Sequence, residues 1–276
     1  MGDKKMKFEI QNKKLQDLLN YLKVDTLYPT CILSTKDQKL YSSQTESYGY
    51  AFRFALFDAS FFKAISKEND SVKIDVEKAL KIIKTMDPEE LLTVQYPSPL
   101  SESKINIKGK YDSNNITVQT IEEGEAKEGL IFKMEKGIPL LKADTENPVK
   151  LDNKITISLQ DFKAIAEKAT AYGTEFYSFN VDKNKKLIVR VGDLHNASDF
   201  DNYNPKEFKV DAKEEIKAVY TKGINEIAKT LTADNVELNI KSSAPIWISS
   251  VDKHYRLGFL LPPHNKEEDD IEEDEE

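Results

Sequence analysis

Residues 76–86 read V-E-K-A-L-K-I-I-K-T-M, and this stretch decides the fold class of the chain. Its apolar residues recur at every third or fourth position, which places them on one side of an α-helix. Lys78, Lys81 and Lys84 fall on the opposite side when the stretch is wound at about 100° per residue. The stretch therefore predicts a short amphipathic helix whose exposed face is basic.

Three further segments, Leu15–Leu22, Leu159–Ala169 and Ile224–Leu231, have the same apolar spacing. Ser158, directly before the second of them, is a typical N-cap residue. Runs rich in β-branched and aromatic residues lie between the helices, and turn-forming pairs such as Lys183-Asn184 separate the runs. The predicted strands include 30–34, 50–57, 91–96, 104–108, 116–121, 175–181, 187–191, 236–240, 246–251 and 255–261. These elements predict the α+β class.

The four predicted helices form two pairs with nearly equal intervals. In each half of the chain the two helix centres lie about 62 residues apart, and each half reads strand, helix, several strands, helix, three strands. We expect two similar domains, each with helices packed on one face of an antiparallel sheet. Their predicted bounds are 1–131 for the N-terminal domain, 132–153 for a connecting loop, 154–264 for the C-terminal domain and 265–276 for an acidic disordered tail.

The composition is that of a globular protein without covalent crosslinks. Of its 276 residues, 39% are hydrophobic and 32% are charged, which suits one large core or two moderate ones. The single Cys31 cannot form an intramolecular disulfide or a zinc cage, and it indicates a reducing compartment. No signal peptide or membrane-spanning run is recognisable. We expect a cytoplasmic protein, or a nuclear one in a eukaryote, with no membrane association and no cofactor or metal.

The lysines of the helices stand out against the acidic charge of the chain. Its net charge is −8, yet the predicted helices are net positive. Lysine neutralises phosphate without the planar fork with which arginine fixes one geometry, so the pattern predicts sequence-independent contact with double-stranded DNA. The competing interpretation, that lysines keep helix surfaces soluble, holds for any single one of them. The predicted DNA-facing residues are Lys13, Lys14, Lys23, Lys78, Lys81, Lys84, Lys163, Lys168, Lys222 and Lys229.

Three stretches of the chain have counterparts in a known family. Residues 136–140 read K-G-I-P-L; residues 244–263 contain A-P-I-W-I and H-Y-R-L-G-F-L-L-P-P and are followed by acids; residues 40–50 contain L-Y-S-S and Y-G-Y. These stretches resemble the interdomain connecting loop, the last hairpin with its acidic tail, and the early strand pair of the proliferating cell nuclear antigen (PCNA) family of DNA sliding clamps. The resemblance extends over nearly the whole chain.

The resemblance implies the DNA clamp fold and a homotrimeric, pseudo-sixfold ring whose helices line a channel around duplex DNA. It implies that neighbouring subunits join between edge strands near residues 115–121 and 196–203. The implied function is that of a polymerase processivity factor, which tethers replication and repair proteins to DNA. Its implied partners are DNA polymerase, clamp loader, nuclease and ligase, bound through short client motifs.

The resemblance also implies a pocket for the client motif, which is a glutamine followed by a one-turn helix with apolar and aromatic anchors. Matched position by position, the pocket residues are Tyr48, Tyr50, Ile138, Leu140, Pro245, Phe259 and Leu261. Leu261 stands where the family usually has a small residue, and two tyrosines replace aliphatic residues, so the motif preference stays open. Without the resemblance, Phe259 and Leu261 are interpreted as core residues of a terminal strand.

Other functions stay open at this stage. A β-rich scaffold that binds proteins but not DNA, or a specialised checkpoint-type clamp subunit, would share much of the pattern. The three histidines are scattered, and neither a glycine-rich phosphate loop nor a nucleophile elbow is present in the sequence. The remaining catalytic candidate is the pair Asp199 and Asp201, with Asp193 nearby, which could bind a divalent cation for phosphoryl transfer. We expect a protein that is not an enzyme.

Overall fold

The computed structural model describes residues 5–23, 30–45, 52–121, 132–135, 138–141, 148–173, 176–192, 200–220 and 223–264. The chain forms two compact units. Unit 1 comprises Met1–Leu130, Lys229–Ala233 and Ser249–Phe259, and unit 2 comprises Ile131–Ala228, Asp234–Ile248 and Leu260–Glu276. Two short segments from the C-terminal half therefore belong to unit 1. The domain bounds expected from the sequence stay a prediction.

Unit 1 has two sheets and two helices in its described part. Its elements are β1 (Met6–Gln11), α1 (Asn12–Leu22), β2 (Thr30–Lys36), β3 (Lys39–Thr45), β4 (Phe52–Phe57), the 3₁₀ turn Ala59–Phe61, β5 (Ala64–Ile65), β6 (Asp70–Asp75), α2 (Val76–Ile83), β7 (Leu91–Tyr96), β8 (Lys104–Lys108) and β9 (Ser113–Thr117). One sheet has the order β5-β1-β7-β8-β9, and in the other β4, β3, β2 and β6 are neighbours. All of these pairings are antiparallel.

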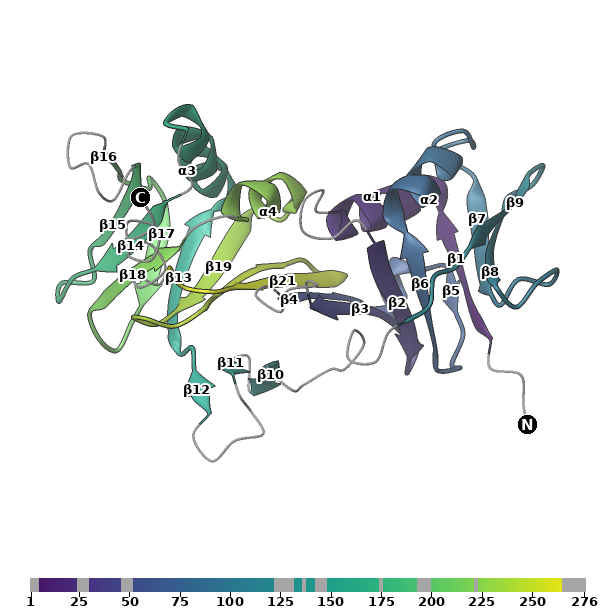
Figure 1. The fold of residues 1–276 in the computed structure, drawn as a ribbon, viewed down its shortest axis with the longest axis horizontal. Coiled ribbons are helices and arrows are strands. Elements are labelled where there is room, and N and C mark those ends of the chain that lie inside the picture. The colour runs from purple at the N-terminus through teal and green to yellow at the C-terminus, as the bar shows by residue number, and fades with distance from the viewer. Residues whose placement is uncertain are drawn as a thin grey trace, which may run out of the picture. The chain divides into compact units, whose positions relative to one another are not determined.

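Alternation of apolar and polar residues explains how unit 1 forms its core. On β1, Met6, Phe8 and Ile10 are buried while the residues between them face outward. The apolar stripes of α1 and α2 are buried as well, and the two helices contact each other (Figure 1). Because each helix has one apolar stripe, burial of that stripe on the strands leaves the lysine-bearing side in solvent.

An aromatic cluster shows why C-terminal residues belong to unit 1. The ring of Tyr255 lies 5.0 Å from that of Tyr21 and 6.1 Å from that of Phe57, measured between centroids. Its hydroxyl is 2.8 Å from the hydroxyl of Thr232. Aromatic pairs at such distances add stabilisation beyond the area that they bury. The segments 229–233 and 249–259 therefore complete the core of unit 1.

Unit 2 repeats the arrangement of unit 1. Its elements are β13 (Asn153–Ser158), α3 (Leu159–Ala171), β14 (Tyr177–Val181), β15 (Leu187–Gly192), β16 (Phe200–Tyr203), β17 (Phe208–Asp211), β18 (Ile216–Tyr220), α4 (Ile224–Thr230), β19 (Asn235–Ile240) and β20 (Ile246–Val251). The division between the units falls within α4, within β20 and within β21 (Tyr255–Leu261), of which only Leu260 and Leu261 belong to unit 2. One sheet has the order β16-β15-β14-β18, and β17, β13, β19 and β20 are neighbours in the other. Helix α3 packs on β13, β15 and β19.

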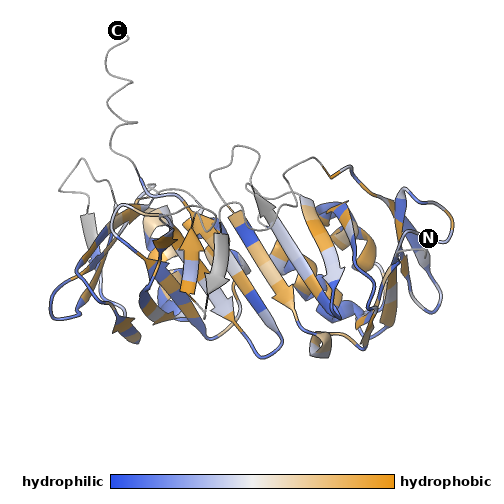
Figure 2. Ribbon diagram, turned by 90° about the horizontal axis from the view of Figure 1, so that it is seen from below, coloured by the Kyte–Doolittle hydropathy of each residue, from blue (hydrophilic) through white to orange (hydrophobic). Residues whose placement is uncertain are grey.

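The same motif of strand, helix and three strands occurs four times along the chain. In unit 1 it is β1-α1-β2-β3-β4 and β6-α2-β7-β8-β9, and the later copies begin at β13 and β18. The four helices expected from apolar spacing are confirmed. So is the α+β class with antiparallel sheets. Figure 2 shows strands with alternating hydrophobic and hydrophilic residues, joined by turns that are largely hydrophilic.

Of the predicted strand boundaries, those of residues 116–121 differ most from the structure. The strand expected at residues 116–121 is β9, Ser113–Thr117. A tight turn, in which the Gly109 N–H donates to the Asp112 carbonyl at 2.8 Å, starts the pairing with β8 early. Beyond Thr117 the backbone leaves β8, since the Gln119 N–H donates to the Lys73 carbonyl of β6. Local propensity could not reveal this change of partner.

The segment predicted as a connecting loop contains a small antiparallel sheet. It consists of β10 (Phe132–Glu135), β11 (Ile138–Leu141) and β12 (Val149–Lys150), in that order, and we call it the connector sheet. Pro139, Leu140 and Leu141 on its central strand are buried. Their burial explains why these three residues lie in a strand although the segment has many polar residues.

Candidate nucleic-acid interface and docking residues

The helices carry the lysines that the sequence analysis assigned to DNA. Nine of the ten predicted lysines lie on the four helices or directly after a helix end, while Lys222 lies outside the described residues. The exposed ones are Lys13, Lys14, Lys78, Lys81, Lys84 and Lys229, and the half-buried ones are Lys23, Lys163 and Lys168. The amphipathic pattern thus places lysine side chains on the outer face of the helices. Whether these lysines face DNA stays a prediction.

Helix α2 is the clearest case of a basic helix face. Its N-cap is Asp75, whose carboxylate accepts a hydrogen bond from the Lys78 N–H at 2.8 Å. Lys78, Lys81 and Lys84 are exposed, and the acid on this face, Glu77, pairs with Lys81 at 2.9 Å. An exposed pair one helical turn apart contributes only about 0.3–0.5 kcal/mol. The face therefore keeps a surplus of positive charge that the helix does not need for its own stability.

The structure adds two facts about charged side chains of the helices that the sequence did not reveal. The ammonium group of Lys14 lies 5.6 Å from the centroid of the Phe61 ring, a cation–π contact that holds this lysine over the aromatic cluster. Asp161 on α3 is buried, with 4% of its surface exposed. It therefore adds little negative charge to the exposed face of α3.

Asp161 is the centre of a hydrogen-bond network that joins α3 to the end of β16. Its carboxylate accepts hydrogen bonds from the Tyr203 hydroxyl at 2.7 Å, from the Ser158 hydroxyl at 2.9 Å and from the N–H groups of Lys206 and Glu207 at 3.2 Å. The N-cap role of Ser158 is confirmed, since its hydroxyl accepts from the Asp161 N–H. The spacing Ser158-x-x-Asp161 was a readable signal for capping. The partnership with Tyr203 was not readable.

This network shifts the ionisation of both of its titrating members. Burial by itself would raise the pKa of the Asp161 carboxyl, but the hydrogen bonds from Tyr203, Glu207, Ser158 and Lys206 favour the carboxylate and leave the pKa below its ordinary value. Burial, together with the hydrogen bond to Asp161, raises the pKa of Tyr203 to about 12. At neutral pH the pair is thus a carboxylate that accepts from a neutral phenol.

We expect Asp161→Asn to lower the free energy of unfolding at pH 7 by about 2 kcal/mol, since a hydrogen-bonded buried carboxylate is lost. The folded-state pKa of Asp161 is depressed, so its contribution is complete above the ordinary value of 3.8 and is lost as the pH falls through the folded-state pKa. Urea unfolding at pH 7, 5 and 3 measures this. The difference between wild type and variant should shrink at pH 3, and a difference that stays constant would contradict this role of the carboxylate.

Two edge strands match the places where the sequence resemblance put subunit contacts. β9 is the last strand of its sheet in unit 1, and β16 is the last strand of its sheet in unit 2. Residues 196–199 lie outside the described residues. An edge strand has unpaired backbone groups on one side and can accept a strand of another chain. The Asp161–Tyr203 hydrogen bond holds one end of β16 on α3, which would keep this edge in place.

Some of the residues assigned to the client pocket are buried. Tyr48 and Tyr50 lie outside the described residues. Ile138 on β11 and Pro245 before β20 are half-buried, and Leu140 is buried. Phe259 and Leu261 on β21 are 1% and 3% exposed, so both serve as core residues, as the interpretation without the resemblance expected. The assignment of these residues to a client pocket stays a prediction.

The described residues form neither a metal-binding cluster nor a membrane-spanning helix. Among them, no group of three or more histidine, cysteine, aspartate or glutamate side chains is placed to hold a metal ion. The catalytic candidates Asp193 and Asp199, and the side chain of Asp201, lie outside that part of the chain. No helix in the described ranges is both long and apolar enough to cross a membrane. Cys31 is buried, and burial raises the pKa of its thiol to about 12, which disfavours a reactive thiolate.

Two units built from a repeated strand–helix–three-strand motif, with lysines on the helices, have the fold of PCNA-type sliding clamps. The chain is similar to the crystal structure of proliferating cellular nuclear antigen from Entamoeba histolytica, with a TM-score of 0.74 and 16% identity over 94% of this chain and 99% of that one. It is also similar to the structure of the C-terminal region of FEN-1 bound to A. fulgidus PCNA, with a TM-score of 0.72 and 14% identity over 95% and 99%. No family model matches the sequence, and neither does any curated protein. At such low identity the similarity concerns the fold.

Proposed function

We propose that this protein is a DNA sliding clamp, which encircles duplex DNA as a homotrimeric ring and tethers polymerases and other replication and repair proteins to it. The observation that carries the proposal is the clamp fold combined with net-positive helix faces in a chain of net charge −8. A fold alone does not establish a function. The segregation of lysine onto the helices is the second, independent feature.

The proposed mechanism needs weak contacts only. A closed ring cannot leave a circular duplex without opening, so long residence follows from topology and not from affinity. Exposed lysines suit such a ring, because each is a mobile charge that neutralises phosphate without reading bases. The acidic remainder of the chain discourages DNA from binding elsewhere on the surface. DNA diffuses through the channel while the ring stays attached.

In this proposal the clamp acts by concentration and not by chemistry. Clients such as a polymerase, a nuclease, a ligase and the clamp loader would dock through short motifs, and their local concentration at DNA would rise. One of the similar structures named above holds the C-terminal region of FEN-1 on a PCNA, which supports client binding on this fold. We therefore propose a non-enzymatic protein, at work in the cytoplasm or, in a eukaryote, in the nucleus.

The solution mass tests the assembly without assuming any binding site. We expect light scattering to give about three times 31.5 kDa across a range of protein concentrations, because β9 and β16 offer one unpaired strand edge each and three copies close a ring. A persistent monomer would count against the homotrimer. It would favour either a heteromeric clamp of the checkpoint type, tested by adding candidate partner subunits, or a protein-binding scaffold without a channel.

A further inference from the structure

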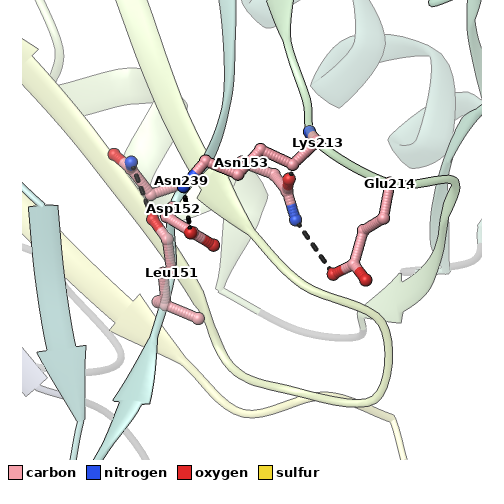
Figure 3. A network of polar contacts seen from close by, with 6 residues as sticks. All are labelled: Leu151, Asp152, Asn153, Lys213, Glu214 and Asn239. Atoms are coloured by element: carbon pink, nitrogen blue, oxygen red, sulfur yellow. Dashed lines mark hydrogen bonds and ion pairs between the residues drawn. The ribbon is translucent and has the colours of Figure 1, made fainter.

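Three consecutive residues join the connector sheet to β13, and each has its own hydrogen-bond partner (Figure 3). Leu151 is buried, its N–H donates to the Pro139 carbonyl of β11 at 3.0 Å, and its carbonyl accepts from the Asn239 side chain at 3.0 Å. The carboxylate of Asp152 pairs with the Lys213 ammonium at 2.6 Å. This hydrogen bond lowers the pKa of the Asp152 carboxyl, although burial opposes the shift.

Asn153 is the most constrained member of this network. Its side chain is fully buried, and both of its polar atoms are used. The Oδ1 atom accepts from the Lys213 N–H at 2.9 Å, and the Nδ2 atom donates to the Glu214 carboxylate at 3.3 Å. A buried amide that lost these partners would pay the full cost of its desolvation. Asn153 therefore ties the start of β13 to the turn between β17 and β18.

The network reaches the connector sheet through a short and continuous path. β12 ends at Lys150, directly before Leu151, and pairs with β11 at Leu140 and Leu141. Residues 151–153 are therefore linked to β11 both through the β12 pairing and through the hydrogen bond between Leu151 and Pro139. β11 carries Ile138 and Leu140, two of the residues assigned above to client docking.

We propose that Asn153, with Lys213, Glu214 and Asn239, is a positioning device that holds the connector sheet in the place where client peptides dock. The inference rests on the proposed clamp function, which it deepens by naming residues that act through the connector without touching a client. The order of the connector and the binding of a client are separate observables, so each can fail alone.

The test compares isosteric variants of the full chain. Asn153→Asp keeps the acceptor for the Lys213 N–H but turns the donor toward Glu214 into a second carboxylate, which is repelled at neutral pH. We expect hydrogen exchange at the Leu151 amide to become at least about tenfold faster. Adding Glu214→Gln restores one donor and one acceptor across this contact, and the exchange rate should return to within about threefold of wild type.

Client binding is measured with a fluorescent peptide that carries the C-terminal region of FEN-1. Its dissociation constant should rise at least about tenfold in Asn153→Asp and recover in the double variant. The matched control is Asn12→Asp in unit 1, where a fully buried amide donates to the carbonyls of Ile83, Met86 and Asp87. This control should lower the unfolding midpoint while Leu151 exchange and peptide binding stay unchanged.

Two results would overturn the proposal, and both are distinguishable from a failure of the proposed function. Unchanged exchange at Leu151 in Asn153→Asp would show that the network does not hold the connector. Faster exchange with unchanged peptide affinity would show that the held connector does not position a client. If the peptide does not bind the wild-type protein, the result would instead contradict client docking, which is part of the proposed function. If Asn153→Asp does not fold, Lys213→Ala removes only the ion pair between the exposed Lys213 side chain and the half-buried Asp152, and it should raise exchange about threefold.

Discussion

Replacing Lys78, Lys81 and Lys84 by glutamate together is expected to shorten the residence of the protein on nicked circular duplex DNA by at least about tenfold. The three side chains are exposed on one face of α2, and the residues that hold the helix in place are on the other face. If each lysine neutralises one phosphate, the slope of log affinity against log salt should fall by about 2–3 per protomer. Retention on nicked circular DNA, measured by gel filtration at several salt concentrations, gives both quantities.

A triple variant with the same change of charge is the control. Lys183, Lys185 and Lys186 are exposed in the turn between β14 and β15, and none of them lies on a helix. Their replacement by glutamate should leave both the residence time and the salt slope within about twofold of wild type. Equal losses in the two triple variants would mean that net charge alone matters, and the assignment of the α2 face to DNA would be abandoned.

Phe259→Ala is expected to lower the free energy of unfolding by about 3–5 kcal/mol, because the ring is 1% exposed and its loss leaves a cavity. This is a large part of the 5–15 kcal/mol that is typical of a folded domain. The same variant should lose client-peptide binding, but the loss of stability would explain that result on its own. Urea unfolding, followed by intrinsic fluorescence, measures the stability change.

Phe259→Leu separates the two roles of this residue. Leucine keeps most of the apolar volume, so the expected cost is about 1–2 kcal/mol and the variant stays folded at 25 °C. If the aromatic ring forms part of a client pocket, the affinity for the FEN-1 peptide should still fall at least about tenfold. Wild-type affinity in Phe259→Leu would leave Phe259 as a core residue only, and the pocket would have to be sought elsewhere.

The resemblance to the clamp family located the client-pocket residues along the chain, but it did not show whether they are exposed. Leu140, Phe259 and Leu261 occupy the expected positions of the chain, but they are buried. A position match reports where a residue lies along a strand, whereas exposure depends on which elements cover that strand. The docking residues therefore need the peptide experiments above, while six of the helix lysines are already exposed, as their proposed role requires.

The sequence by itself determined the four helices, the repeated arrangement and the α+β class. These features depend on periodicity within about ten residues. An apolar stripe such as the one in residues 76–86 is stable only when the helix face that carries it is buried. The basic face of α2 follows from the same stretch. None of these inferences needed a contact between distant residues.

Only the tertiary structure decided which distant residues meet. The hydrogen bond between Tyr203 and Asp161 joins positions 42 apart, Tyr255 completes a core built by the N-terminal half, and Asn153 is held by the turn that follows β17. Such partners depend on how strands pair and on what covers them, and neither leaves a periodic trace in the chain. The physical reason is that helix periodicity is a local property, whereas burial and hydrogen-bond partnership belong to the folded whole.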